Sequence, residues 1–172
     1  MCIRDRVKVN TAREMHQACL SSLPADIAIC AAAVADWYVV NTATQKQKKQ
    51  SHVQPQIELA KNPDILASLS QATSRPPLVI GFAAETEHLI RHAKDKLAKK
   101  KCDWIIANHI SDDPSSSVFG SDQNKASLLK GVDIIDWPYQ SKQALAERLI
   151  VEIDQWINCL LYTSDAADDR YR

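Results

Sequence analysis

One nearly unbroken apolar segment, residues 27–34, most constrains how this chain folds. It runs from Ile27 to Val34 through alanines, a further isoleucine and one cysteine. A continuous apolar run, rather than an alternating one, is typical of a parallel strand buried on both faces. The segment is followed at once by one carboxylate, Asp36, after which the chain turns polar. Open α/β sheets bind ligands beyond the carboxyl ends of their strands, so we expect a ligand edge here.

Helix and strand patterns alternate on both sides of this segment. Helix starts are expected at Thr11, with Glu14 completing a capping box, at Asn62 with Pro63 in the first helical position, at Thr86 and at Ser141. Strands are expected at residues 7–9, 27–34, 78–82 and 104–107, and as a hairpin of 126–129 with 132–135. This order predicts an α/β fold with a Rossmann-like, doubly wound, mostly parallel sheet and a small antiparallel addition.

Composition excludes several classes of partner. The 172 residues carry 21 basic and 21 acidic side chains, so no net charge attracts nucleic acid or an anionic membrane. No apolar run reaches the length of a membrane span. Five scattered cysteines fit reduced thiols in a cytoplasmic protein. The three glycines include none in a first strand-to-helix turn, so the chain has no glycine-rich phosphate loop.

Several further motifs follow the apolar segment in a fixed order. They are Lys46-Gln47-Lys48-Lys49, Lys61-Asn62-Pro63-Asp64-Ile65-Leu66, Gly81-Phe82-Ala83-Ala84-Glu85-Thr86 and Ile106-Ala107-Asn108. Together with residues 31–36, and across residues 7–158, this series resembles phosphopantothenate–cysteine ligase. In many bacteria that ligase is the C-terminal domain of a bifunctional protein whose other domain is a flavin-dependent phosphopantothenoylcysteine decarboxylase.

The resemblance implies a specific reaction of coenzyme A biosynthesis. The carboxylate of 4′-phosphopantothenate attacks the α-phosphate of CTP, which gives an acyl-cytidylate and pyrophosphate. The amine of L-cysteine then displaces CMP and forms the amide. Mg²⁺ is expected with the nucleotide, FMN only with a fused upstream decarboxylase domain, and a homodimer as the assembly. ATP in place of CTP stays open.

The resemblance also assigns site residues. Lys46, on a polar segment at residues 41–56 that we interpret as a flap, is the candidate catalytic cation. The candidate CTP-binding residues are Ala31, Ala32, Asp36, Lys46, Pro63, Asp64, Ile65, Leu66, Phe82, Lys96 and Lys100. The sequence leaves the metal ligands unknown. Cys30 is expected in the core and not as a nucleophile.

Each of these candidates also has a purely structural interpretation. The lysine run at residues 46–49 can be a solvated, exposed loop. Lys96 and Lys100 lie four residues apart and share one helix face, which a solvated basic face also shows. Asp36 can cap a turn, and Phe82 can be a core residue instead of a ring that packs on the nucleotide.

Both ends of the chain depart from the family pattern. We expect a ligase domain at residues 7–160 that lacks the family's first strand and glycine-rich turn, and we expect this polypeptide to be inactive alone. Residues 1–6 and 161–172 match nothing in the family and are interpreted as non-native tails; ordinary disordered tails are the alternative. A nucleotide-binding module or an inactive fragment, without ligase chemistry, is the alternative function.

Overall fold

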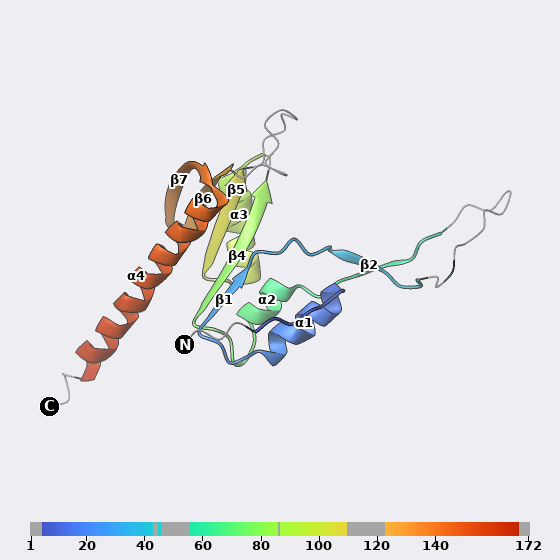
Figure 1. The fold of residues 1–172 in the computed structure, drawn as a ribbon, viewed down its shortest axis with the longest axis horizontal. Helices are drawn as coiled ribbons and strands as arrows, with labels where there is room; N and C mark the ends of the chain where they lie inside the picture. The colour runs from blue at the N-terminus through green and yellow to red at the C-terminus, as the bar shows by residue number, and fades with distance from the viewer. Residues whose placement is uncertain (1–4, 43–44, 46–55, 86, 110–122, 169–172) are drawn as a thin grey trace. The chain divides into compact units, whose positions relative to one another are not determined.

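The computed structural model describes residues 5–42, 45, 56–85, 87–109 and 123–168, and Figure 1 traces its elements. The helices are α1 (Ala12–Ser21), α2 (Ile65–Ser70), α3 (Leu89–Lys100) and α4 (Lys142–Asp168). The strands are β1 (Ile27–Cys30), β2 (Trp37–Val39), β3 (Leu59–Lys61), β4 (Leu78–Glu85), β5 (Trp104–His109), β6 (Gln123–Lys130) and β7 (Asp133–Ser141).

Five strands form one mixed sheet in the order β1-β4-β5-β6-β7. β1 pairs in parallel with β4, in a register that places Ile27 opposite Leu78 and Cys30 opposite Gly81. Helix α3 connects β4 to its neighbour β5, the βαβ connection of a parallel sheet. β6 and β7 form the antiparallel addition. The predicted fold class, a mostly parallel α/β sheet with a small antiparallel part, is therefore confirmed.

The chain divides into two compact units, each with its own buried residues. The first unit comprises residues 1–82 and 96–104, and the second comprises residues 83–95 and 105–172. The first buries mainly α2 and the start of β4, with Ile65, Leu66, Leu69, Leu78, Val79, Ile80, Cys102 and Trp104. The second buries β5, β6 and one side of α4, with Ala83, Ala93, Ile105, Ile106, Ala107, Leu128, Leu129, Trp137, Leu145, Leu149 and Ile153.

Three of the local signals for turns and caps are confirmed. Thr11 Oγ1 accepts a hydrogen bond from the Glu14 amide at 3.1 Å, and the Glu14 carboxylate reaches back to the Asn10 amide at 2.7 Å. Gly131 turns the β6–β7 hairpin with a φ of +58°, a conformation that favours glycine. Ser141 Oγ accepts from the Ala144 amide at the start of α4.

Two strand predictions were wrong: one strand did not form, and the other is shorter than expected. Residues 7–9 form no strand, and the side chain of Val7 is 67% exposed. The strand expected at residues 27–34 ends at Cys30, and the residues after it are exposed. β1 has β4 as its single neighbour among the described strands, so Ile29 stays 46% exposed. An apolar run therefore did not guarantee burial on both faces, because burial depends on a second neighbouring strand.

The start of α2 was also displaced from its prediction. Asn62 was expected to cap this helix, but Asp64 is the cap and α2 begins at Ile65. The Asp64 carboxylate accepts the Ala67 amide at 3.0 Å. Both residue types cap helices well, so propensity alone does not choose between them. The side chain of Asn62 instead donates to the carbonyl of Ala35, a contact between segments that sequence patterns do not show.

Burial varies along α3 and between two of the tryptophans, and some predicted segments lie outside the described residues. Ala93 is buried in α3, while Leu89, Ile90 and Leu97 are half-buried. Trp104 is buried and Trp156 is half-buried. Thr86 and most of the flap at residues 41–56 lie outside the described residues. α4 continues to Asp168, past the predicted domain limit at residue 160.

The small two-stranded sheet was not predicted. β2 pairs antiparallel with β3, so that Trp37 lies opposite Lys61 and Val39 opposite Leu59. Both strands are short and largely exposed, so they lack the buried pattern from which strands are usually recognised. The Lys61 ammonium lies 5.6 Å from the centre of the Trp37 ring, which adds a cation–π contact to the ladder.

A carboxylate ties the entry of β4 to the entry of β5. Asp103 Oδ2 accepts from the buried Val79 amide at 2.7 Å and from Arg75 at 2.5 Å. In return, the Asp103 amide donates to the Val79 carbonyl at 2.9 Å. Val79 is fully buried, so water cannot replace a lost acceptor. Asp103 therefore ties the start of β4 to the residues that lead into β5, all of them within the first unit.

We expect Asp103→Ala to lower the free energy of unfolding by about 2 kcal/mol, because it leaves a buried amide without its acceptor. Chemical denaturation of the full chain measures this change. Asp95→Ala, at an exposed carboxylate on α3, is the matched control and should stay within about 0.5 kcal/mol of wild type. Equal midpoints for the two variants would contradict the role of Asp103.

Candidate nucleotide site

The candidate site begins at the N-terminus of α2. Asp64 has extended backbone angles (φ −82°, ψ 97°), and its side chain bends back to accept the Ala67 amide. Ile65 and Leu66 then enter the core, 8% and 9% exposed, and hold the helix against the first unit. The cap thus fixes the Asp64 carboxylate at the N-terminus of α2. Its second oxygen, Oδ2, is directed toward Lys100.

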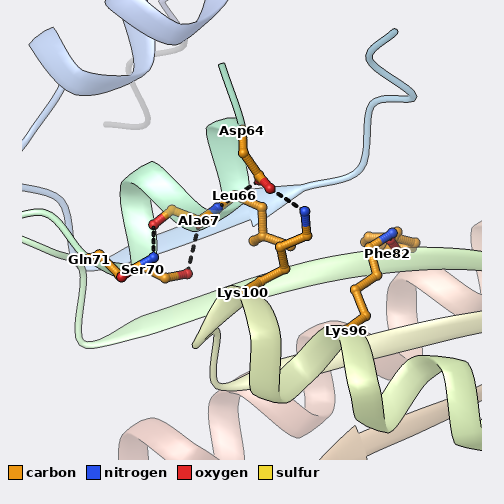
Figure 2. A network of polar contacts seen from close by, with 8 residues as sticks. All are labelled: Asp64, Leu66, Ala67, Ser70, Gln71, Phe82, Lys96 and Lys100. Atoms are coloured by element: carbon orange, nitrogen blue, oxygen red, sulfur yellow. Dashed lines mark hydrogen bonds and ion pairs between the residues drawn. The ribbon is translucent and has the colours of Figure 1, made fainter. Parts of the chain in front are cut away.

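Two lysines of α3 approach this edge. Lys100 forms an ion pair with Asp64 Oδ2, and Lys96 donates to the carbonyl of Phe82 in β4 at 2.8 Å. Figure 2 shows both lysines projecting from α3, Lys100 toward Asp64 and Lys96 toward Phe82. The predicted sharing of one helix face by the two lysines is confirmed. The structure thereby brings together four of the predicted residues: Asp64, Phe82, Lys96 and Lys100.

The electrostatics of this cluster keep Asp64 ionised. Burial opposes its ionisation, but hydrogen bonds from Lys100 and the Ala67 amide, with the charges of Lys100 and Lys96, outweigh burial and lower its pKa. The Lys100 side chain is 21% exposed and the Asp64 side chain 42%. A partly shielded pair of this kind is screened less by salt than a fully exposed one.

The segment that follows β1 is brought to the start of α2 by Asn62. The Asn62 amide donates to the Asp36 carbonyl at 2.8 Å, and its side-chain amide donates to the Ala35 carbonyl at 2.9 Å. Ala31, Ala32 and Asp36 are themselves exposed. Two hydrogen bonds to consecutive carbonyls therefore place Asp36 beside Pro63, although no apolar packing holds it there.

Sequence reasoning missed the role of Asn62. The residue was recognised only as a helix start, and its partners lie 26 and 27 residues earlier in the chain. The one available signal was its position between the Ala31–Asp36 and Pro63–Leu66 motifs in the same candidate site. Lys46, the predicted catalytic cation, lies outside the described residues, as do Lys48 and Lys49.

Cys30 and Cys102, both in the first unit, do not offer a reactive thiolate. Burial, with smaller contributions from neighbouring charges, raises the pKa of Cys30 to about 11. Burial likewise raises the pKa of Cys102 to about 11. Both thiols are therefore protonated at neutral pH, and a protonated thiol is a poor nucleophile. Cys30 was expected in the core and not as a nucleophile; its side chain is only half-buried, and its raised pKa disfavours the nucleophilic thiolate.

The described residues contain neither a metal-binding cluster nor a membrane-spanning helix. Within them, no three His, Cys, Asp or Glu side chains lie close enough together to hold a metal ion. In the same part of the chain, no helix combines the length and the apolar character needed to cross a bilayer.

The fold and the cluster together define an α/β protein of the doubly wound class, with lysines gathered where a helix meets the sheet. Residues 3–157 match the family model described as "DNA/pantothenate metabolism flavoprotein C-terminal domain" (DFP). The chain belongs to this family.

Relatives of known name support the same assignment. The "Coenzyme A biosynthesis bifunctional protein CoaBC" of Haemophilus influenzae is 39% identical over 150 residues, which cover 87% of this chain and 36% of the relative. The protein of that name from Escherichia coli K12 is 37% identical over 153 residues, 86% of this chain and 37% of the relative. The chain thus spans little more than a third of these relatives.

Solved structures agree in fold. The crystal structure of the C-terminal domain of a CoaBC protein matches with a TM-score of 0.68 and 26% identity, over 88% of this chain and 65% of that one. A Streptococcus pneumoniae protein, also titled a DNA/pantothenate metabolism flavoprotein, matches with a TM-score of 0.67 and 20% identity, over 86% of this chain and 71% of its own. The second likeness supports the fold alone.

We expect Asn62→Ala to lower the free energy of unfolding by about 1 kcal/mol, the usual contribution of one hydrogen bond. It should also speed hydrogen exchange at the Asn62 amide, because the contact with the segment after β1 loosens. Asn41→Ala removes an exposed 3.3 Å contact to Glu58 and serves as the control, with a change within about 0.5 kcal/mol. Equal exchange rates in wild type and Asn62→Ala would refute this role.

Proposed function

We propose that this chain is the nucleotide-binding part of a phosphopantothenate–cysteine ligase of coenzyme A biosynthesis, which uses CTP. The observation that carries the proposal is the cluster of Asp64, Phe82, Lys96 and Lys100. Three segments distant in sequence converge there. Membership of the DFP family and the likeness to CoaBC proteins support it.

The proposed chemistry needs cations near a phosphate chain. The substrate carboxylate attacks the α-phosphate of CTP, pyrophosphate leaves, and the amine of cysteine later displaces CMP to form the amide. Negative charge develops on the phosphoryl oxygens during the first step, and fixed lysines stabilise it. Lys96 and Lys100 supply such charge, and Lys46 is proposed as a third, catalytic cation.

Other residues of the cluster suit the remaining parts of a nucleotide. The first turn of α2, with Pro63 before it, presents backbone amides that can donate to polar ligand groups. The half-buried ring of Phe82 can pack on the base or ribose. Exposed Asp36, with Ala31 and Ala32 beside it, can accept hydrogen bonds from the nucleotide.

The described residues do not form a Mg²⁺ cage, since no group of three suitable side chains occurs among them. Both oxygens of Asp64 are already used by Ala67 and Lys100. We propose Mg²⁺ as the counterion of CTP, where it would offset the charge of the phosphates. We assign no step to the metal or to FMN, which would belong to a fused decarboxylase domain. A homodimer and a cytoplasmic location are likewise part of the proposal.

The test is a thermal-shift titration of the full chain with CTP and with ATP, each with Mg²⁺. CTP at 100 times its Kd should add about 2.7 kcal/mol to the free energy of unfolding, with a smaller effect of ATP at equal concentration. Lys100→Ala and Lys46→Ala should each raise the Kd for CTP by about tenfold, because a hydrogen bond to a charged group contributes roughly 1.5–3 kcal/mol.

Lys99→Ala is the matched control, since Lys99 is exposed on the same helix. It removes one positive charge from α3 and should leave the Kd within about twofold of wild type. A cooperatively unfolding chain that shows no shift with either nucleotide would reject the proposal. Equal losses for Lys99→Ala and Lys100→Ala would reduce it to nonspecific attraction by a basic helix.

A further inference from the structure

The two oxygens of the Asp64 carboxylate have separate partners within the protein. Oδ1 accepts the Ala67 amide at 3.0 Å and closes the N-terminus of α2. Oδ2 accepts the ammonium of Lys100, which lies 36 residues further along the chain. Figure 2 shows the carboxylate between the helix turn and the lysine. A carboxylate engaged on both sides is poorly placed to accept a hydrogen bond from a nucleotide.

Lys96 and Lys100 are held in different ways. Lys96 donates to a neutral backbone carbonyl, that of Phe82 in β4. Lys100 is held by a charged side chain whose own position is fixed by a helix cap. A free lysine side chain has considerable rotamer entropy, so a fixed acceptor lowers the entropic cost of presenting its charge to a ligand.

We propose that Asp64 is a positioning residue, which does not touch the nucleotide with its side chain but holds Lys100 in the geometry that binds the phosphates. This inference rests on the proposed function and refines it. The resemblance to the ligase family implies that Asp64 contacts the nucleotide directly. The hydrogen bonds of its carboxylate instead favour an indirect role, through Lys100.

A double-mutant cycle separates the indirect role from a direct contact. The four proteins are the wild-type full chain, Asp64→Asn, Lys100→Gln and the double variant, and the readout is the Kd for CTP with Mg²⁺ by calorimetry. Asparagine caps helices as well as aspartate does, so Asp64→Asn keeps the cap of α2 while it removes the ion pair. Asp95→Asn, an exposed carboxylate on α3, controls for the change of charge.

We expect Asp64→Asn to raise the Kd by about fivefold in the wild-type background, in line with one partly shielded ion pair. In the Lys100→Gln background it should have no further effect. Asp95→Asn should leave the Kd unchanged. A loss that persists in the Lys100→Gln background would show that Asp64 contacts the nucleotide directly and would overturn the positioning role. Unchanged or tighter binding by Asp64→Asn would overturn it as well.

A second measurement needs no nucleotide. The pKa of the Asp64 carboxyl, followed by NMR in the full chain, should lie below its ordinary value in wild type and rise in Lys100→Gln. A merely structural effect on α2 would not produce this rise. An unchanged Asp64 pKa in Lys100→Gln would overturn the pairing itself. Failure of the wild-type chain to bind CTP, with the pKa response intact, would instead overturn the proposed function, and the positioning role with it.

Discussion

Two lysine ammonium groups on one face of α3 need fixed oxygen acceptors, and the candidate site depends on this constraint. Lys96 donates a hydrogen bond to the carbonyl of Phe82, and Lys100 forms an ion pair with the carboxylate of Asp64. Both acceptors are held by backbone structure, the first by β4 and the second by the N-terminal turn of α2. Because neither acceptor is on a freely rotating side chain, α2, β4 and the C-terminal half of α3 are tied together at one place.

The segment after β1 is held in a different way, by hydrogen bonds from the backbone and side chain of Asn62 to backbone carbonyls instead of by burial. β1 ends at Cys30, and Asp36 is exposed. Asn62 holds the carbonyls of residues 35 and 36, and the ladder of β2 with β3 begins at the next residue, where Trp37 lies opposite Lys61. A segment held in this manner keeps its side chains accessible to a ligand while its backbone stays in place.

Structural features that depend on residues close together in the chain could be predicted from the sequence. Features that depend on residues distant in the chain could not. The capping box at Thr11, the turn at Gly131 and the shared face of Lys96 and Lys100 are local, and the structure agrees with them. The depth of burial of β1 depends on which strands flank it in the sheet, which its own residues do not reveal. The choice of Asp64 over Asn62 as cap depends on partners elsewhere: Lys100 for the first and Ala35 for the second. For the same reason the sequence placed Lys100 in the site but could not identify its partner.

The distribution of charge within the cluster bears on how such a site would act. Asp64 offsets the charge of Lys100, while the partner of Lys96 is a neutral carbonyl. In the proposed site, Lys96 would then supply most of the electrostatic attraction for an anionic substrate. Lys100 would mainly orient the substrate by a directed hydrogen bond. The raised pKa values of half-buried Cys30 and buried Cys102 keep both thiols protonated at neutral pH, which makes them poor nucleophiles. For the proposed ligase, the reaction between two bound substrates would be accelerated by orientation and fixed charge.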